Sequence, residues 1–246
     1  MRNLESLFPN KIEYFFDKEN YYNEVSKTIP KGYTLEDVIR FANHKLNEPD
    51  WQSYNETLGL FVSAAVNKIV ENTKREGEKI KIEWTLKGSI GNLFYKLKDC
   101  EVHINKAGDW LGDNAENSEF YVKEARNYAG HQAKDSKFTI NKAGILLGAN
   151  AKRCEFNVGE AGVFAGMYAK DSKFTINETG DYLGDSAERC QFYVEKAGDY
   201  AGWLAEDSKF TINVAENFLG YSAKRCKFDV KYRGWMVIGD WNTVVK

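Results

Sequence analysis

The residue types that most often carry chemistry, cysteine and histidine, are few in this 246-residue chain. Cys154, Cys190 and Cys226 are spaced by 36 residues, twice the length of the repeat described below, and Cys100 lies further upstream. In a stack of coils, two coils separate such residues by about 9–10 Å. That exceeds the roughly 7 Å between Cα atoms that a disulfide allows and prevents convergence on a tetrahedral metal ion. We expect four small buried core residues, with no metal site and no cofactor.

The three histidines, His44, His103 and His131, give no sign of an acid–base site. A catalytic histidine needs an orienting acid and a substrate cleft, and the sequence indicates neither. We therefore expect His131 at the surface, His44 in a helix and His103 in the first coil. The chain also lacks the P-loop, HExxH, GxSxG and GxGxxG motifs. We expect no catalytic residue and no enzyme activity.

Charge and hydropathy exclude two further classes. The chain has 34 Lys and Arg residues against 36 Asp and Glu residues, a net charge of -2. This balance argues against nucleic-acid binding, which normally needs a basic excess. No apolar run reaches the roughly 20 residues of a membrane span, and the N-terminus lacks the pattern of a secretory signal. We expect a cytoplasmic protein that binds neither nucleic acid nor membrane.

An 18-residue repeat organises most of the chain. Seven gapless blocks run from Asn105, as in KEARNYAGHQAKDSKFTI, and a degenerate block precedes them from Lys87. Three columns hardly vary, and they consist of Ala115, Ala133, Ala151, Ala169, Ala187, Ala205 and Ala223; of Phe120, Phe138, Phe156, Phe174, Phe192, Phe210 and Phe228; and of Gly112, Gly130, Gly148, Gly166, Gly184, Gly202 and Gly220.

The end of each block predicts a β-strand. Ser136, Phe138 and Ile140 alternate with polar residues, so they point to one face of a strand. Eighteen residues are too few for a helical repeat but suit one coil of a β-solenoid, bent at glycine corners. We predict a mainly β fold, a parallel solenoid over residues 79–246. Its C-terminal cap would comprise residues 231–246, in which Trp235, Met236, Val237, Ile238 and Trp241 replace the regular pattern.

Alternate blocks differ in charge. One column reads Asp135, Arg153, Asp171, Arg189, Asp207 and Arg225. Equal charges would repel in a parallel in-register stack, whereas alternating charges pair between neighbouring coils. The column could be a ligand-binding strip, but we favour control of strand register.

Residues 1–78 lack this periodicity and predict a small helical segment. Thr34 and Asp37 resemble a capping box before a helix that extends to about Leu46. A second helix is expected from about Glu56 to Lys74, and a third from Tyr14 to Val25. The segment either caps the solenoid or binds a partner. Ile80, Ile82, Trp84 and Leu86 then alternate as in a strand that enters the first coil.

The blocks Lys106–Gly112 (KAGDWLG) and Lys196–Gly202 (KAGDYAG) resemble the GXGXG repeat. This domain ends the large subunit of glutamate synthase and makes up one of the subunits of formylmethanofuran dehydrogenase. The resemblance covers about residues 87–240. It implies a single-stranded right-handed parallel β-helix with a largely structural role in a larger enzyme complex, and it assigns no catalytic residue.

An alternative comes from another class. Leu111–Glu116 and Leu183–Glu188 resemble the hexapeptide of left-handed β-helical acyltransferases. Those enzymes repeat the hexapeptide on all three sides of the coil, whereas one side fits here. We therefore favour a structural or protein-interaction scaffold over a transferase.

The most variable positions directly follow the glycine column. If this corner points outward, a possible interaction strip forms from Met167, Tyr168, Trp203, Leu204 and Tyr221. Contiguous exposed apolar surface tends to mark an interaction site. Alternatively, some of these residues fold inward beside the alanine column. The expected partner is another protein or a second copy of the chain.

Overall fold

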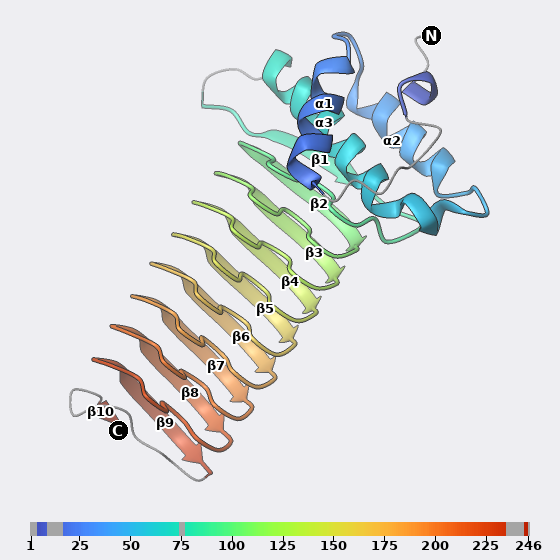
Figure 1. The fold of residues 1–246 in the computed structure, drawn as a ribbon. Helices are drawn as coiled ribbons and strands as arrows, with labels where there is room; N and C mark the ends of the chain where they lie inside the picture. Colours follow the sequence, from blue (N-terminus) through green and yellow to red (C-terminus); the bar gives the residue numbers. More distant parts are fainter. Residues whose placement is uncertain (1–3, 9–16, 74–76, 235–243, 246) are drawn as a thin grey trace.

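The computed structural model describes residues 4–8, 17–73, 77–234 and 244–245. Its main feature is a parallel β-solenoid whose coils are stacked along one axis (Figure 1). Ten strands form one sheet in chain order. They are β1 (Ile80–Trp84), β2 (Cys100–Ala107), β3 (Glu119–Ala125), β4 (Lys137–Ala143), β5 (Glu155–Ala161), β6 (Lys173–Thr179), β7 (Gln191–Ala197), β8 (Lys209–Ala215), β9 (Lys227–Arg233) and β10 (Val244–Val245). The predicted solenoid is therefore confirmed.

The 18-residue coil is confirmed by the strand register. Phe120 pairs with Phe138, and the same spacing holds from β2 to β9. The first coil is longer, because Ile80 pairs with Cys100. Its two extra residues lie between β1 and Ile90, where Gly88 packs against the Trp51 ring of the helical segment. The periodic blocks contain no signal for this insertion.

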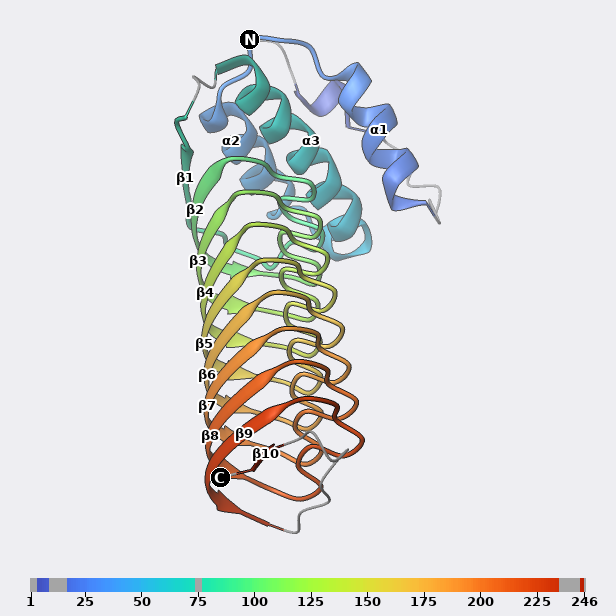
Figure 2. The same ribbon diagram turned by 90° about the vertical axis from the view of Figure 1, so that its left-hand side faces the viewer.

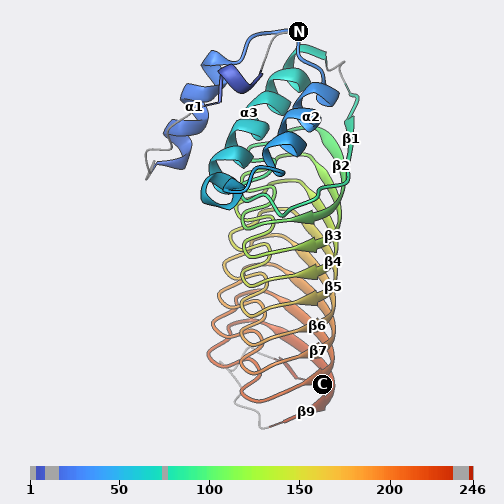
Figure 3. The ribbon, with the colours of Figure 1, turned by 90° about the vertical axis from the view of Figure 1, so that its right-hand side faces the viewer.

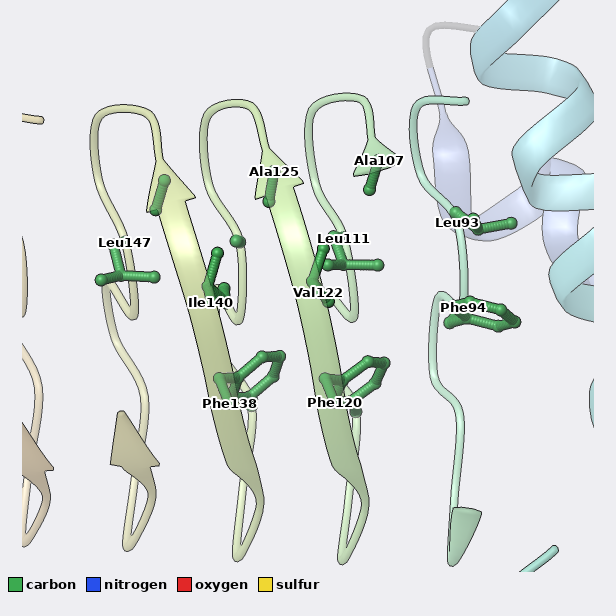
Figure 4. Packing of buried hydrophobic residues seen from close by; sticks show 14 of the residues in the cluster. Leu93, Phe94, Ala107, Leu111, Phe120, Val122, Ala125, Phe138, Ile140 and Leu147 are labelled. Carbon is green, nitrogen blue, oxygen red and sulfur yellow. The ribbon is translucent and has the colours of Figure 1, made fainter. Parts of the chain in front are cut away.

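The core is a continuous stack of phenylalanine rings. Ring centroids of successive residues from Phe120 to Phe228 lie 4.6–5.0 Å apart, with nearly parallel planes. Figure 4 shows the same arrangement in two successive coils, with Phe120 beneath Val122 and Phe138 beneath Ile140. The polar residues between them in each strand remain accessible to water. Each coil therefore buries its apolar residues against its neighbours, which makes stability a sum of contacts between adjacent coils.

The glycine column forms a sharp corner, as predicted. All seven glycines have φ between +62° and +75°, a backbone region that favours glycine. The corner also lies directly against the core, since a Cβ atom on Gly148 would meet the Phe156 ring at 2.7 Å. The alanine column is completely buried next to it.

In the column that holds the cysteines, hydrogen bonds link each coil to the next. The backbone N–H of Cys154 donates to Ser172 Oγ (3.0 Å), and the N–H of Ser172 donates to Cys190 Sγ (3.5 Å). All four cysteines are buried thiols, which confirms the sequence prediction. Burial raises the pKa of the Cys154 thiol to about 11 and the pKa of Cys190 to about 12, so both are protonated at neutral pH.

The N-terminal segment contains three α-helices, α1 (Lys18–Thr28), α2 (Leu35–Lys45) and α3 (Asn55–Thr73), and two short 3-10 helices, η1 (Leu4–Ser6) and η2 (Trp51–Tyr54). The predicted capping box is present, since Thr34 and Asp37 exchange side-chain and backbone hydrogen bonds. The helices predicted from Thr34 and from Glu56 correspond to α2 and α3. The third, predicted from Tyr14 to Val25, overlaps α1 over residues 18–25, and α1 continues to Thr28. Tyr14, Phe15 and Phe16 lie outside the described residues.

Helix α3 lies across the first coil (Figure 2). Its polar side chains bond backbone groups that have no preceding coil to pair with. Ser63 Oγ accepts from the N–H of Tyr95 (3.0 Å), and Asn67 Nδ2 donates to the Tyr95 carbonyl (3.0 Å). The approach is so close that a Cβ atom on Gly59 would lie 1.7 Å from the carbonyl oxygen of Gly91. At the other end, Trp235, Met236, Val237, Ile238 and Trp241, expected to form a cap, lie outside the described residues.

Candidate functional site

The strands lie along one side of the solenoid and the turn segments along the opposite side, which we call the turn side (Figures 2 and 3). On the turn side every second residue has a positive φ, as in Trp110 (+64°), Gly112 (+62°) and Asn114 (+57°). The N–H groups of Trp110 and Asn114 donate to the next coil, and that of Gly112 donates to the preceding coil. This alternation fixes the direction of each side chain, so equivalent residues form straight columns.

An aromatic ladder runs along the turn side, which the sequence prediction did not include. We define it as Trp110, Tyr128, Phe164, Tyr182, Tyr200 and Phe218, with Leu146 filling the same column. The rings of Tyr182 and Tyr200 are 5.0 Å apart, and those of Tyr200 and Phe218 are 4.7 Å apart. All of these rings are half-buried. The signal was present, because six aromatic residues occupy one column of seven repeats.

The predicted interaction strip lies beside this ladder. Tyr168, Leu204 and Tyr221 are 48%, 46% and 41% exposed, so the outward orientation is correct for them. Met167 and Trp203 are half-buried. Trp203 leans on the ladder, with its ring 5.2 Å from that of Tyr182. We call these five residues the apolar strip.

His131 does not lie free at the surface, so that prediction is wrong. Its side chain is 17% exposed, and its Nδ1 lies 3.0 Å from Oδ1 of Asp113. The Trp110 ring packs edge-on against the imidazole. Asp113 lies 18 residues before His131 in the same column of the repeat, so the stacking of the coils places the acid directly beneath the histidine.

Asp113 is buried at the junction with the helical segment. Lys18, the first residue of α1, forms an ion pair with Asp113 Oδ2, and Asn114 Nδ2 donates to Asp113 Oδ1 (2.9 Å). The Lys18 ammonium also lies 4.7 Å from the ring centroids of Tyr95 and Trp110. The acid and the histidine are therefore part of a contact that holds α1 against the solenoid.

A second buried acid occupies the same column. Asp185 is 8% exposed, and its Oδ1 accepts from Ser186 Oγ (2.8 Å). No cation pairs with Asp185 among residues 4–8, 17–73, 77–234 and 244–245. Burial raises the pKa of this carboxyl above its ordinary value, and the hydrogen bond from Ser186 offsets only part of that effect. Along the stack, Asp185 lies between Met167 and Trp203 of the apolar strip, and the neighbouring Ser186 lies between the exposed Tyr168 and Leu204.

The remaining histidines form local pairs. His44 Nε2 lies 3.0 Å from the Glu5 carboxylate, and His103 Nε2 lies 2.6 Å from that of Glu101. His103 is in β2, where its ring stacks on Tyr121 at 4.5 Å. Within the described part of the chain, no three His, Cys, Asp or Glu side chains are placed to hold a metal ion.

The column of alternating charge forms the predicted ion pairs between coils. Arg153 binds both carboxylate oxygens of Asp135, at 2.7 and 2.6 Å. Arg189 and Arg225 likewise bind the aspartates of the coils that precede them, Asp171 and Asp207. These hydrogen bonds lower the pKa of each aspartate. Both members of each pair are thus engaged with the neighbouring coil, as register control requires.

Comparison of the chain with models of protein families, with curated proteins and with solved structures gave no match. Where the structure describes the chain, no helix has the length and hydropathy that a membrane span needs. The functional interpretation therefore depends on the geometry of the turn side itself.

Proposed function

We propose that this protein is a non-catalytic scaffold that binds another protein through the apolar strip, as a subunit of a larger assembly. The exposure of Tyr168, Leu204 and Tyr221 on a single side of the solenoid carries the proposal. Large apolar side chains gathered on one surface are typical of protein interfaces. Tyrosine and tryptophan, both present in the strip, are also the residues that most often dominate interface energies.

The rigidity of the turn side supports the same function. The backbone of the strip is hydrogen-bonded to the coils on both sides: the N–H of Tyr168 donates to the backbone carbonyl of Asp185 in the next coil, and the carbonyl of Met167 accepts from the N–H of Asn150 in the preceding coil. Trp203 is further held by contacts with Tyr182 and Tyr200. A surface that is ordered before binding loses little conformational entropy when a partner docks, which favours affinity. Such preorganisation is useful to a scaffold.

The arrangement of polar groups argues against catalysis. The charged columns form ion pairs between coils, and the buried Asp113 is paired with both His131 and Lys18. A reactive group needs access to a substrate, and these groups are engaged with one another. For the acyltransferase alternative, we expect no binding heat when acetyl-CoA is titrated into the protein.

The proposal is tested by affinity purification from cells that naturally express the protein. The strip variant carries Tyr168→Glu, Leu204→Glu and Tyr221→Glu. A matched control carries the same number of glutamates on the strand side, Thr139→Glu, Thr175→Glu and Gln191→Glu. All six side chains are exposed, and Gln191 lies between Lys173 and Lys209 in the sheet, so we expect both variants to fold.

We expect a protein that co-purifies in fixed ratio with the wild type and the control but not with the strip variant. The purified partner should then rebind the wild type in a titration, with at least a tenfold loss for the strip variant. A partner retained by the strip variant would contradict the proposal, as would a wild-type protein that purifies alone.

A further inference from the structure

Two segments of the turn side are near copies of each other, four coils apart. Residues 109–116 read DWLGDNAE, and residues 181–188 read DYLGDSAE. They place Asp113 and Asp185 in the same column, and both carboxylates are buried. The residue after each aspartate donates a hydrogen bond to its Oδ1, from Asn114 in one case and from Ser186 in the other. The two sites therefore share both the acid and the group that orients it.

The first site shows what such an acid binds. The Oδ2 of Asp113 holds the ammonium of Lys18, which lies in the first turn of α1. Four residues further along the helix, the Tyr22 ring packs edge-on against Tyr95, at 5.1 Å. Tyr95 occupies the position one coil before Asp113. The ligand of this site is thus a lysine on a helix, followed by an aromatic residue that packs beside the acid.

The second site has the same acid and, among the residues that the structure describes, no cation beside it. Met167 stands one coil before Asp185, in the position of Tyr95, and Trp203 stands one coil after it, in the position of His131. Both are half-buried and leave the carboxylate in apolar surroundings. Tyr182 differs from Trp110, because Phe164 and Tyr200 stack on both of its faces. Tyr182 therefore forms a wall of the site, whereas Trp110 offers a face to Lys18.

A buried carboxylate that has no cation beside it should bind most favourably a cation that is attached to an apolar group. Moving a carboxylate out of water is costly unless it is paired, so an incoming ammonium recovers part of that cost. The exposed Tyr168 and Leu204 flank the site on the coils before and after it. They would cover the stem of a lysine and the helix that carries it. A free inorganic cation would gain nothing from these residues.

We propose that Asp185, flanked by Met167 and Trp203, binds the ε-ammonium group of a lysine on the partner protein. The lysine lies in a helix, with an apolar or aromatic residue four positions later that packs on Met167. This inference rests on the proposed function, because it places the partner on the apolar strip and specifies the chemistry that the partner must present there.

The test uses n-butylammonium as a probe of the lysine side chain. The full-length protein is labelled with ¹⁵N, and the indole N–H signal of Trp203 is assigned with the Trp203→Phe variant. We expect a saturable shift of that signal on titration and at least a tenfold weaker response in Asp185→Asn, which keeps the size of the side chain. The neutral probe n-butanol should give no saturable shift. A butylammonium response that is absent, or unchanged in Asp185→Asn, would overturn the proposal.

A second probe establishes the source of the ammonium group. An acetylated peptide of residues 17–28, the α1 sequence, should perturb the Trp203 signal, and its Lys18→Gln form should not. Binding of butylammonium without binding of the peptide would assign the site to a small amine and contradict the proposal. A Trp203 signal that shifts with the concentration of the protein alone would assign the site to a second copy of the chain, which also contradicts it.

The two proposals can fail separately. A partner that binds Asp185→Asn as tightly as the wild type, but does not bind the strip variant, would refute the lysine site and leave the scaffold function intact. A protein that binds butylammonium through Asp185 and yet purifies without a partner would refute the scaffold function.

Discussion

The two buried aspartates of the turn side should respond oppositely to loss of charge. Asp113→Asn removes the ion-pair partner of Lys18. The side chain of Lys18 is 29% exposed, and that of Asp113 is 3% exposed. Breaking a fully buried ion pair costs about 3–5 kcal/mol and breaking an exposed pair costs about 0–1 kcal/mol. This half-buried pair should therefore contribute about 1–3 kcal/mol to the docking of α1.

Hydrogen exchange measures this contribution locally. A loss of about 1–3 kcal/mol should speed amide exchange in the peptide that covers α1 by about 5- to 150-fold, if exchange follows local opening. Exchange in the core strands β6 to β8 should change much less, because they lie several coils away and stability depends on neighbouring coils.

Asp185→Asn should raise the thermal midpoint at pH 7. Burial raises the pKa of Asp185 in the folded protein, so stability falls as the pH rises from about 4 through that folded value. The substitution removes the charge that causes this loss. The difference between variant and wild type should shrink as the pH approaches about 4, where the carboxyl becomes protonated in both states. The reasoning is refuted if Asp185→Asn and Asp113→Asn both lower the thermal midpoint at pH 7. It is also refuted if the amides of α1 exchange at the wild-type rate in Asp113→Asn.

Three further predictions concern the stack itself. Phe156→Ala, which removes a buried ring stacked between two others at 5.0 and 4.7 Å, should lower the free energy of unfolding by about 3–5 kcal/mol in urea titrations. None of the four cysteines should react with a thiol reagent at pH 8 in the folded protein, because all are buried and burial raises the pKa values of Cys154 and Cys190. All four should react in denaturant, where unfolding exposes them. Arg153→Gln should lower the thermal midpoint at pH 7 but not well below pH 4, because Arg153 lowers the pKa of Asp135 and the stability gained from the pair disappears once that carboxyl is protonated. Equal effects of Arg153→Gln at both pH values would contradict this.

The periodic part of the fold could be predicted from the sequence because every repeat has the same local pattern of residues. The alternation around Phe138, the small residue before it and the glycine corner all recur every 18 residues and lead to one register. The capping box at Thr34 was predictable for the same reason, since it depends on residues three positions apart. Local and repeated signals agree here with the global fold.

Contacts that occur once could not be predicted. Lys18 and Asp113 are 95 residues apart, and nothing in either local sequence indicates their ion pair. The longer first coil depends on how Gly88 meets Trp51 of the helical segment. The pair of His131 and Asp113 could have been predicted, because the two residues are 18 positions apart in one column of the repeat, as Asp135 and Arg153 are. The aromatic ladder could also have been predicted, because aromatic residues occupy its column in most of the repeats. The sequence prediction did not compare the repeats at that position.

The molar mass of the protein isolated from its natural cells tests the central claim most directly. A single chain has a mass of 28.1 kDa. Light scattering coupled to size-exclusion chromatography should show the wild type in a species well above that mass and the strip variant at about that mass. A wild-type protein that elutes at 28.1 kDa, with the strip variant indistinguishable from it, would contradict the account.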